Sequence, residues 1–267
     1  MIIDFHTHVF PDKIAAGAIA SLEERAKLKA GTDGTVNGLL ASMDISGVDI
    51  SVVMPVVTSV LQFDSINRFA AENQSKRLVF FGGIHPDCDN PEEKIDALSR
   101  AGFIGIKLHP DYQGTFITDK KYIRISRAAL ERGMYITIHA GVDIGLPEPV
   151  HCPPELSAKM LEAVKDLNTG EPHIILAHMG GYAMSDAVLE HLCGKNVLFD
   201  TGFNIAREDR EVMKKIINTH GAENILFATD SPWNTPSSCL DALEKLDLTS
   251  EQRDLILFKN ALRIINV

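Results

Sequence analysis

The sequence predicts a single α/β domain over residues 1–267, folded as a (β/α)8 TIM barrel, and three observations support this prediction. Short apolar runs rich in β-branched residues alternate eight times with longer stretches of helical pattern. Most of these runs are unbroken, which is typical of parallel strands covered by helices on both faces. Eight βα units in about 250 residues is the usual size of this barrel, and the sequence has no glycine-rich phosphate loop to favour an open doubly wound sheet.

The expected strands and helices alternate along the chain, and each connection is long enough for a parallel crossover. Strands are expected at residues 1–6, 50–57, 78–84, 103–108, 134–139, 173–178, 196–200 and 224–229. Helices are expected at residues 12–29, 61–76, 91–101, 119–132, 155–168, 183–193 and 207–220.

Glycine and proline mark several boundaries. Gly102, Gly133 and Gly221 each lie between a helical stretch and the next strand, as glycine does after a helix end. Pro91 suits the first position of its helix, with Asn90 before it as the cap. Residues 141–154 are irregular and rich in Gly and Pro. Because this stretch follows the fifth strand, we expect it to form a lid or wall over the site.

Composition excludes several classes of function. A net charge of -10 and 45% hydrophobic residues indicate a globular protein without a basic surface for nucleic acid or anionic membrane. The start of the chain lacks the pattern of a signal peptide, and no apolar run approaches the ~18 residues of a membrane span. We expect a cytoplasmic protein that acts on a small-molecule substrate. Whether the chain forms a homo-oligomer is left open by the sequence. The cysteines have no CxxC spacing and are expected to be free thiols: Cys88, Cys152, Cys193 and Cys239.

His6 and His8 lie one residue apart at the end of the first expected strand. Strand side chains repeat every second residue, so both imidazoles can hold one metal ion. Five other expected strands also end in a ligand-type residue: His85, His109, His139, His178 and Asp230. Barrel enzymes keep their chemistry at the carboxyl ends of the strands, so we expect these side chains at one rim. Three histidines lack this placement and are expected to be ordinary surface or helix-end residues: His173, His191 and His220.

Four motifs together resemble the amidohydrolase superfamily. They are Asp4-Phe5-His6-Thr7-His8, Ile138-His139-Ala140-Gly141, the segment 176–181 around His178, and the segment 227–232 around Asp230. Their order and spacing are more specific than any one of them alone. More narrowly, the chain resembles the amidohydrolase-related (amidohydrolase 2) branch of metal-dependent TIM-barrel hydrolases, lactonases and decarboxylases. The resemblance covers almost the whole chain, including the closing segment 260–264.

The resemblance implies one divalent metal ion held by His6, His8, His139 and Asp230. Three imidazoles and a carboxylate suit Zn2+, with Mn2+, Fe2+ or Co2+ as alternatives. The ion would lower the pKa of a bound water from ~15.7 towards ~7, and Asp230 would pass the water's proton to the leaving group. His178 would polarise the substrate carbonyl, or handle the proton on carbon in a decarboxylase. A purely structural role for His178 beside the metal is the alternative.

Lys107 lies on the fourth expected strand, with the same parity as His109. In family members with two metals, a carboxylated lysine from this strand bridges the ions. We expect one metal, since the related branch generally has one. Lys107 would then bind an anionic substrate group, or form an ion pair at the floor of the barrel. His85 and His109 are expected to line the pocket.

Further candidates depend on the same barrel. We expect Asp4 to accept a ring N–H from a metal ligand, with a buried ion pair as the alternative. Arg207 suits a bidentate clamp on a carboxylate, although an arginine that opens a helix is more often a solvated surface charge. Trp233 would contact substrate or pack under the loop 141–154. Tyr112 and His151 also follow strands and are expected on the same rim.

Three functions fit these residues. The first is a metal-dependent hydrolase that acts on a C–N or C–O bond of a small amide, lactone or ester. The second is a non-oxidative decarboxylase of an aromatic or unsaturated acid, which would use the same ligands. Cationic residues over the metal would favour this second function, and Lys107 and Arg207 are the candidates. The third, a barrel that binds without turnover, ranks below because Asp230 and His178 are both present.

Overall fold

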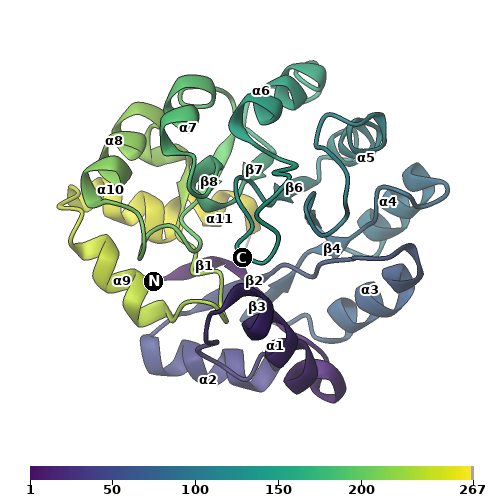
Figure 1. The fold of residues 1–267 in the computed structure, drawn as a ribbon, viewed down its shortest axis with the longest axis horizontal. Helices are drawn as coiled ribbons and strands as arrows, with labels where there is room; N and C mark the ends of the chain where they lie inside the picture. The colour runs from purple at the N-terminus through teal and green to yellow at the C-terminus, as the bar shows by residue number, and fades with distance from the viewer. Residues whose placement is uncertain (266–267) are drawn as a thin grey trace.

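The computed structural model describes residues 1–265, with strands at the centre and helices around them (Figure 1). The strands are β1 (Ile3–Thr7), β2 (Ile50–Val53), β3 (Leu78–Phe80), β4 (Gly82–Gly83), β5 (Gly105–Leu108), β6 (Tyr135–Ile138), β7 (Ile174–Leu176), β8 (Leu198–Asp200) and β9 (Ile225–Leu226). All pairings between these strands are parallel, as predicted from their unbroken apolar runs.

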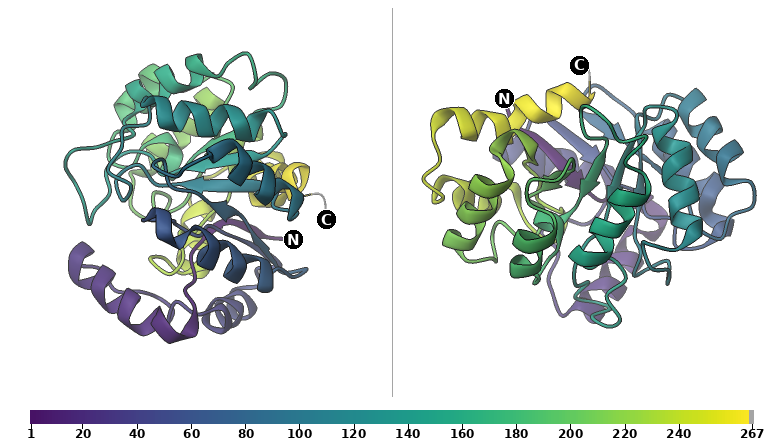
Figure 2. Two further views of the ribbon diagram at one scale, coloured as in Figure 1. Left: turned by 90° about the vertical axis from the view of Figure 1, so that its right-hand side faces the viewer. Right: turned by 90° about the horizontal axis from the view of Figure 1, so that it is seen from above.

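Helices follow most of these strands. They are α1 (Asp12–Ala26), α2 (Val36–Ser46), α3 (Phe63–Glu72), α4 (Pro91–Arg100), α5 (Lys120–Leu130), α6 (Pro154–Ala163), α7 (Ser185–His191), α8 (Arg210–His220), α9 (Pro236–Glu244), α10 (Ser250–Asp254) and α11 (Asn260–Ile265). Short 3-10 or π turns form η1 (Val60–Gln62), η2 (His178–Gly180), η3 (Ala222–Asn224) and η4 (Leu255–Lys259). Helix α1, dark purple, runs along one edge of the molecule (Figure 2).

The strands follow one another in chain order around a ring. One sheet has the order β1-β2-β3 and the other runs from β4 to β9. β3 and β4 are two parts of the expected strand 78–84, interrupted at Phe81, whose N–H still donates to the carbonyl of Val53 (3.0 Å). The N–H of Phe5 donates to the carbonyl of Phe227 (2.8 Å), which joins β1 to the segment after β9. The last strand therefore lies beside the first, as a (β/α)8 barrel requires.

The inside of the ring is packed at the end opposite the histidines. Ile3, Phe5 and Leu226 form a buried cluster there with Ala261 and Ile264 of α11. A larger cluster fills the layer between the strands and the surrounding helices. Because α11 covers the amino-terminal end of the barrel, the carboxyl ends of the strands are left to form the site.

Most predicted boundaries are confirmed within a few residues. Gly102, Gly133 and Gly221 have φ values of 88°, 66° and 96°, as expected of glycines that follow helix ends. Asn90 differs from the prediction, because its side chain makes no capping hydrogen bond and Pro91 alone marks the start of α4. Within residues 1–265, all four cysteines are free, and no helix is long and apolar enough to span a bilayer.

Two helical regions were not predicted. Helix α2 follows Thr35, whose hydroxyl accepts a hydrogen bond from the N–H of Gly38 (2.9 Å), and it ends at Gly47 with φ 71°. These capping signals are present in the sequence, but the glycine in its first turn weakens the helical pattern. Helices α9 to α11 follow β9 and complete the eighth βα unit.

Candidate active site

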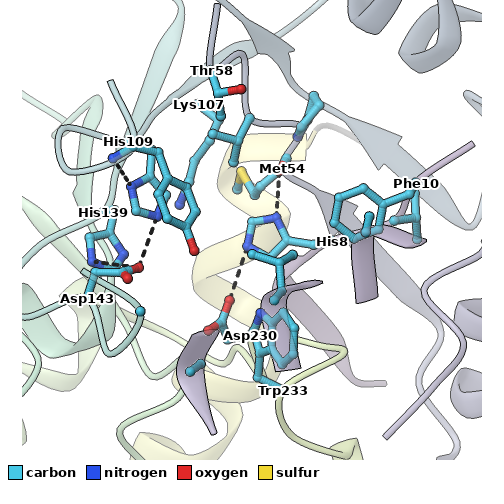
Figure 3. A pocket seen from close by; sticks show the side chains of 18 of the residues that line it. His8, Phe10, Met54, Thr58, Lys107, His109, His139, Asp143, Asp230 and Trp233 are labelled. Carbon is cyan, nitrogen blue, oxygen red and sulfur yellow. Dashed lines mark hydrogen bonds and ion pairs between the residues drawn. The ribbon is translucent and has the colours of Figure 1, made fainter. Parts of the chain in front are cut away.

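A cavity of about 820 Å³ lies at the carboxyl ends of the strands (Figure 3). Its walls come from α1, from the segment after β2 and from residues 142–146 of the irregular loop, which the sequence predicted to be a lid or wall. Most of the predicted site residues line it: His6, His8, Lys107, His109, His139, His178, Asp230 and Trp233. The prediction that residues at the ends of the strands meet at one rim therefore holds for these residues, which are far apart in the sequence.

His6 and His8 point their Nε2 atoms at each other. Nδ1 of His6 lies 2.8 Å from a carboxylate oxygen of Asp200, and Nδ1 of His8 lies 2.7 Å from the carbonyl oxygen of Met54. Both partners accept, so each Nδ1 carries a proton, and a ring without a second proton presents a lone pair at Nε2. The two Nε2 atoms are 3.1 Å apart. Two lone pairs at this distance repel unless a cation or a proton lies between them.

Asp230 adds a third acceptor to this pair. Its Oδ1 lies 3.1 Å from Nε2 of His8 and 3.6 Å from Nε2 of His6. Burial raises the pKa of Asp230, but a proton donated by His8 and the positive charges that His6, His178 and His8 carry when protonated outweigh burial and hold the pKa below its usual value. The backbone of Asp230 has φ 61°, a conformation that is uncommon for non-glycine residues and concentrates at functional sites.

Lys107 places an ammonium group beside the same histidines. Its side chain is buried, and Nζ lies 2.9 Å from Nε2 of His6. Burial lowers the pKa of Lys107 to about 8, and the carboxylates of Asp200 and Asp230 partly offset this effect. Lys107 therefore faces His6 and Asp230, as its position on the strand predicted.

His178 and His139 form a second imidazole pair. Nδ1 of His178 donates to the carbonyl oxygen of Gly202 (2.8 Å), so its Nε2 accepts, and this atom lies 3.0 Å from Nδ1 of His139. Nε2 of His139 faces carboxylate oxygens of Asp111 at 3.7 Å and of Asp143 at 4.0 Å.

The predicted metal ligands fall into two neighbouring groups. Donor atoms of His6, His8 and Asp230 all lie within 4.8 Å of one another, as a single ion requires. His139 instead groups with His109 and Asp143 by the same criterion. The fourth predicted ligand is thus close to the first group but does not join it in this arrangement of side chains.

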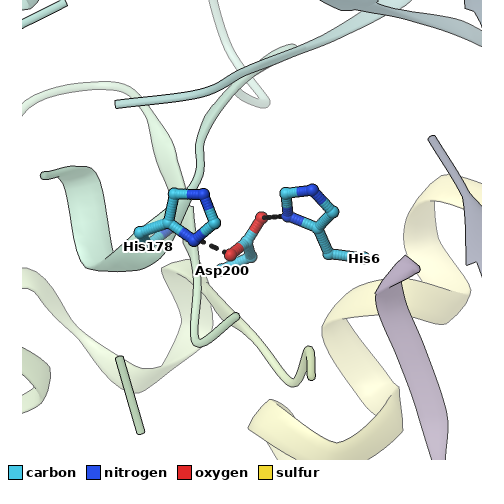
Figure 4. A group of neighbouring side chains, drawn as sticks. All are labelled: His6, His178 and Asp200. Atoms are coloured by element: carbon cyan, nitrogen blue, oxygen red, sulfur yellow. Dashed lines mark hydrogen bonds and ion pairs between the residues drawn. The ribbon is translucent and has the colours of Figure 1, made fainter. Parts of the chain in front are cut away.

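Asp200 is a site residue that the sequence analysis missed (Figure 4). It is fully buried at the end of β8. One oxygen accepts the ring N–H of His6, and the other accepts the backbone N–H groups of His178 (3.0 Å) and Gly202 (2.9 Å). Its signal was available, because the expected strand 196–200 ends at this aspartate just as other strands end at the histidines.

The prediction that Asp4 accepts a ring N–H is wrong, because Asp200 does so. Oδ1 of Asp4 accepts the backbone N–H groups of His6 (3.3 Å) and Thr229 (3.0 Å), and Oδ2 accepts the hydroxyl of Thr229 (2.6 Å). Burial raises the pKa of Asp4 to about 7, although the bonds from Thr229 oppose this shift. Asp4 therefore fixes β1 against the segment that carries Asp230.

Aromatic rings continue from His139 towards α1. His109 stacks on His139 and on Tyr112, with ring centroids 4.1 Å apart in both cases. Cζ of Arg25, on α1, lies 5.9 Å from the centroid of Tyr112. Arg25 lines the cavity and was not predicted, since it lies near the end of helix α1 and not at the end of a strand. Burial raises the pKa of Tyr112 well above its usual value, so its hydroxyl stays protonated.

Two buried carboxylates lie behind this stack. Asp111 accepts the backbone N–H (3.0 Å) and binds the ring nitrogen (3.1 Å) of His151. Burial, together with the charge of Asp111, raises the pKa of Asp143 to about 6. Within residues 1–265, Oδ2 of Asp111, Oδ1 of Asp143 and Nε2 of His139 are buried without a hydrogen-bond partner.

Two residues that were predicted to contact substrate or line the pocket, Arg207 and His85, lie outside the cavity. Arg207 rests on the ring of Phe203, with Cζ 3.6 Å from the centroid, and hydrogen-bonds to Asn234. His85 accepts the N–H of Asp87 (3.2 Å) after β4, and neither residue is among those that line the cavity. Three histidines expected to be ordinary are also outside the lining: His173, His191 and His220. His220, although at a helix end, is buried and bonds to the carbonyl of Val197.

Comparisons with known proteins agree on the family and fold. Residues 3–267 match the family model described as Amidohydrolase (Amidohydro_2). A 5-carboxyvanillate decarboxylase from Novosphingobium aromaticivorans, solved with bound manganese, is similar at 14% identity and a TM-score of 0.70, over 100% of this chain and 97% of that chain.

Two further solved structures have the same fold. A probable 2-pyrone-4,6-dicarboxylic acid hydrolase from Acinetobacter baumannii has 16% identity and a TM-score of 0.69, over 100% of this chain and 99% of that chain. An uncharacterised TIM-barrel protein from Bordetella bronchiseptica has 14% identity and a TM-score of 0.75, over 99% and 98%. A comparison with curated proteins finds no match.

Proposed function

The chain belongs to the amidohydrolase family, and we propose that it is a metal-dependent hydrolase acting on a C–N or C–O bond of an amide, lactone or ester. One observation carries the proposal. Three acceptor atoms converge at the rim: Nε2 of His6, Nε2 of His8 and Oδ1 of Asp230. Lys107 already donates to Nε2 of His6, and a divalent cation would be shared by all three acceptors.

The residues around these acceptors fit a metal site. Each ligand histidine donates its other ring N–H to a fixed acceptor, Asp200 or the carbonyl of Met54, which sets the tautomer that a metal needs. Nitrogen and carboxylate donors suit Zn2+, which we propose as the ion, with Mn2+, Fe2+ or Co2+ as alternatives. When bound, such an ion would supply Lewis acidity and lower the pKa of a water molecule to near 7.

His139 stays a candidate fourth ligand. Its ring is held by His178 on one side and faces Asp111 and Asp143 on the other. His139 has two possible tautomers. If its proton is on Nε2, which faces the carboxylates, then Nδ1 of His139 carries a lone pair that faces the lone pair on Nε2 of His178. These two atoms would then form a second pair of acceptors beside Lys107. That tautomer would favour two ions bridged by a carboxylated Lys107. The other tautomer forms an ordinary hydrogen bond and favours one ion, which we propose.

Asp230 is proposed as the general acid and base. Its depressed pKa keeps the carboxylate ionised at neutral pH, so it can accept a proton from the attacking water. It would then return this proton to the leaving nitrogen or oxygen. His178, whose Nδ1 donates to Gly202, presents Nε2 as an acceptor towards the site, so it would orient the attacking water or a substrate N–H.

Decarboxylation of a small aromatic or unsaturated acid is the alternative. A decarboxylase needs cations that hold a carboxylate over the metal. Arg207 is engaged with Asn234 and Phe203 outside the cavity, and Lys107 is buried against His6, which weakens both candidates. Arg25 on the cavity wall is the one observation in favour, because its guanidinium is available to a carboxylate beside Tyr112. We therefore rank hydrolysis first.

A screen with two sets of substrates tests whether the protein is a hydrolase or a decarboxylase. The purified protein with Zn2+ is offered lactones and esters with proton release as the readout, amides with amine release as the readout, and aromatic acids with carbon dioxide release as the readout. We expect proton or amine release from at least one of these neutral substrates and its loss after chelation. Carbon dioxide release without any hydrolysis would replace the proposal by the alternative.

A further inference from the structure

One face of helix α1 forms a wall of the catalytic cavity instead of packing on the barrel. Ile14, Ala18 and Leu22 line the cavity at a spacing of four residues, which places them on one side of the helix. The buried residues of α1, Ala15 and Ile19, lie on the adjacent side. Ile14 is 55% exposed and, within the described part of the chain, has no partner from the barrel on this side.

Apolar residues from two other segments face the same space. Ile66 and Phe69 come from α3, and Ile144 comes from the loop after β6. We call the space between these residues and Ile14, Ala18 and Leu22 the α1 groove. It belongs to the same cavity as His8 and Asp230. Phe10 and Trp233, which also line this cavity, lie near His8 (Figure 3).

Thr58, Gln62 and Ser65, the polar side chains that face the α1 groove from the segment 58–65, are engaged within that segment, while Lys13 and Arg25 of α1 also line the cavity. Oε1 of Gln62 accepts hydrogen bonds from the N–H (2.9 Å) and hydroxyl (3.0 Å) of Thr58. The hydroxyl of Ser65 donates to the carbonyl of Gln62 (3.1 Å). A sugar or peptide placed here would leave polar groups without partners, whereas a hydrocarbon would lose nothing.

The size of the cavity also exceeds what a small substrate needs. Sites for drug-sized ligands measure roughly 300–1,000 Å³, and this cavity, at about 820 Å³, lies in the upper part of that range. A small lactone or amide that reacts at His6, His8 and Asp230 would leave the α1 groove unfilled.

We infer that the α1 groove binds an apolar alkyl or aryl group of the substrate, joined to the bond that is broken at Asp230. The inference rests on the proposed function, because it makes the hydrolysed molecule an amphipathic amide, lactone or ester. Each methylene buried in the groove should raise affinity about fourfold, equivalent to about 0.8 kcal/mol.

Straight-chain carboxylic acids, from four to ten carbons, are the probes for a direct test. They displace an environment-sensitive dye from the zinc-loaded protein, so binding is measured without turnover. Ala18→Trp should fill the groove, and Ala16→Trp on the exposed side of the same helix is the matched control. We expect the ten-carbon acid to bind at least 100-fold more tightly than the four-carbon acid. Ala18→Trp should weaken the longer acid at least tenfold and change the shorter acid less than twofold, while Ala16→Trp changes neither.

Affinity that does not depend on chain length, or an Ala18→Trp variant that melts like the wild type and binds like it, would overturn the inference. Light scattering tests whether a second copy of the chain occupies the α1 groove instead. Self-association that Ala18→Trp abolishes, without binding of the acids, would show such an interface and would also overturn the inference. The proposed function fails separately. Chain-length-dependent binding without hydrolysis of any amide, lactone or ester would refute the hydrolase and keep the groove.

Discussion

The protons on His6 and His8 decide what can lie between these residues. Asp200 and the carbonyl of Met54 each hold a proton on Nδ1, so both Nε2 atoms are left as acceptors 3.1 Å apart, with Asp230 beside them. Sequence spacing predicted that the two rings share one side of β1. The spacing could not predict which ring nitrogens carry protons. The groups that accept these protons, the carbonyl of Met54 after β2 and the carboxylate of Asp200 in β8, lie far away along the chain.

Replacing Asp230 by Asn should abolish most turnover. The amide is nearly isosteric but cannot accept the proton of the attacking water, and loss of a general base costs about 10²- to 10⁴-fold in rate. We expect kcat to fall by that amount and the melting temperature to stay within a few degrees. Asp247→Asn, at a side chain 97% exposed, is the control and should leave kcat unchanged. Retained activity in Asp230→Asn would remove the acid and base role.

Replacing Asp200 by Asn should weaken the metal. The new amide would keep its oxygen on the N–H groups of His178 and Gly202 and turn its NH2 towards Nδ1 of His6. His6 would then protonate Nε2, the atom that faces the ion. We expect the metal dissociation constant, measured by competition with a chelator, to rise about 10- to 100-fold. An unchanged constant would show that Asp200 does not set the tautomer of His6.

Asp4 should make stability depend on pH. Its pKa is about 7 in the folded protein and 3.8 as the ordinary value, so the folded state binds the proton more tightly. This contribution is fully present below pH 3.8 and is lost as pH rises through 7. Asp4→Asn stays neutral, so its melting temperature relative to wild type should increase from pH 4.5 to pH 7.5. The exposed Asp89→Asn is the control, and a flat difference for Asp4→Asn would refute the assignment.

Residue-level prediction succeeded where strand periodicity decides position. The placement of His6, His8, Lys107, His178 and Asp230 at one rim is confirmed. It failed where contacts between distant strands decide the role. Asp4 and Asp200 are both buried carboxylates on strands, and only the fold shows which of them meets the ring of His6.

At the level of elements, the irregular loop after β6 depends on a glycine at its start. Gly141 has φ 81°, and its N–H donates to the carbonyl of Cys152 (3.0 Å), which closes the loop on itself. A Cβ at this position would lie 2.2 Å from the backbone nitrogen of Tyr182. The loop can therefore form the cavity wall only with glycine at this position.

Gly141→Ala should be clearly destabilising, since it combines a strained backbone with a clash against backbone atoms. We expect a loss of about 2–4 kcal/mol in the free energy of unfolding, measured by urea titration. Gly170→Ala separates the two causes, because Gly170 has φ 71° and its added Cβ meets nothing within 4 Å. It should lose only about 1 kcal/mol. Equal losses in the two variants would show that the contact with Tyr182 is not limiting.

Helix prediction was accurate for amphipathic helices and weak elsewhere. The predicted helices that flank the barrel are confirmed with shifted ends, because the last turn of a helix depends on local caps such as Lys27, which adopts a left-handed conformation after α1. Helix α2 was missed, since its side chains are mostly apolar or small and give little contrast between two faces. The groove along α1 could not be predicted, because periodicity does not show which apolar face stays unpacked.

For the whole molecule, the barrel explains why the site has its composition. Eight parallel strands place their carboxyl ends on one rim, so residues from β1 and β5 and from the segments after β6, β7, β8 and β9 meet there. Repeated apolar runs and strand-end histidines were enough to predict this architecture. The two sheets and the break at Phe81 were not predictable, since they depend on local twist rather than on composition.

The position of the metal is the decisive quantity. Crystals of the zinc-loaded protein, with diffraction recorded above and below the zinc absorption edge, would locate each ion directly. We predict one anomalous peak within about 2.0–2.2 Å of Nε2 of His6, Nε2 of His8 and an oxygen of Asp230. No peak at that position, or a peak held only by His109, His139 and Asp143, would contradict the proposed metal site.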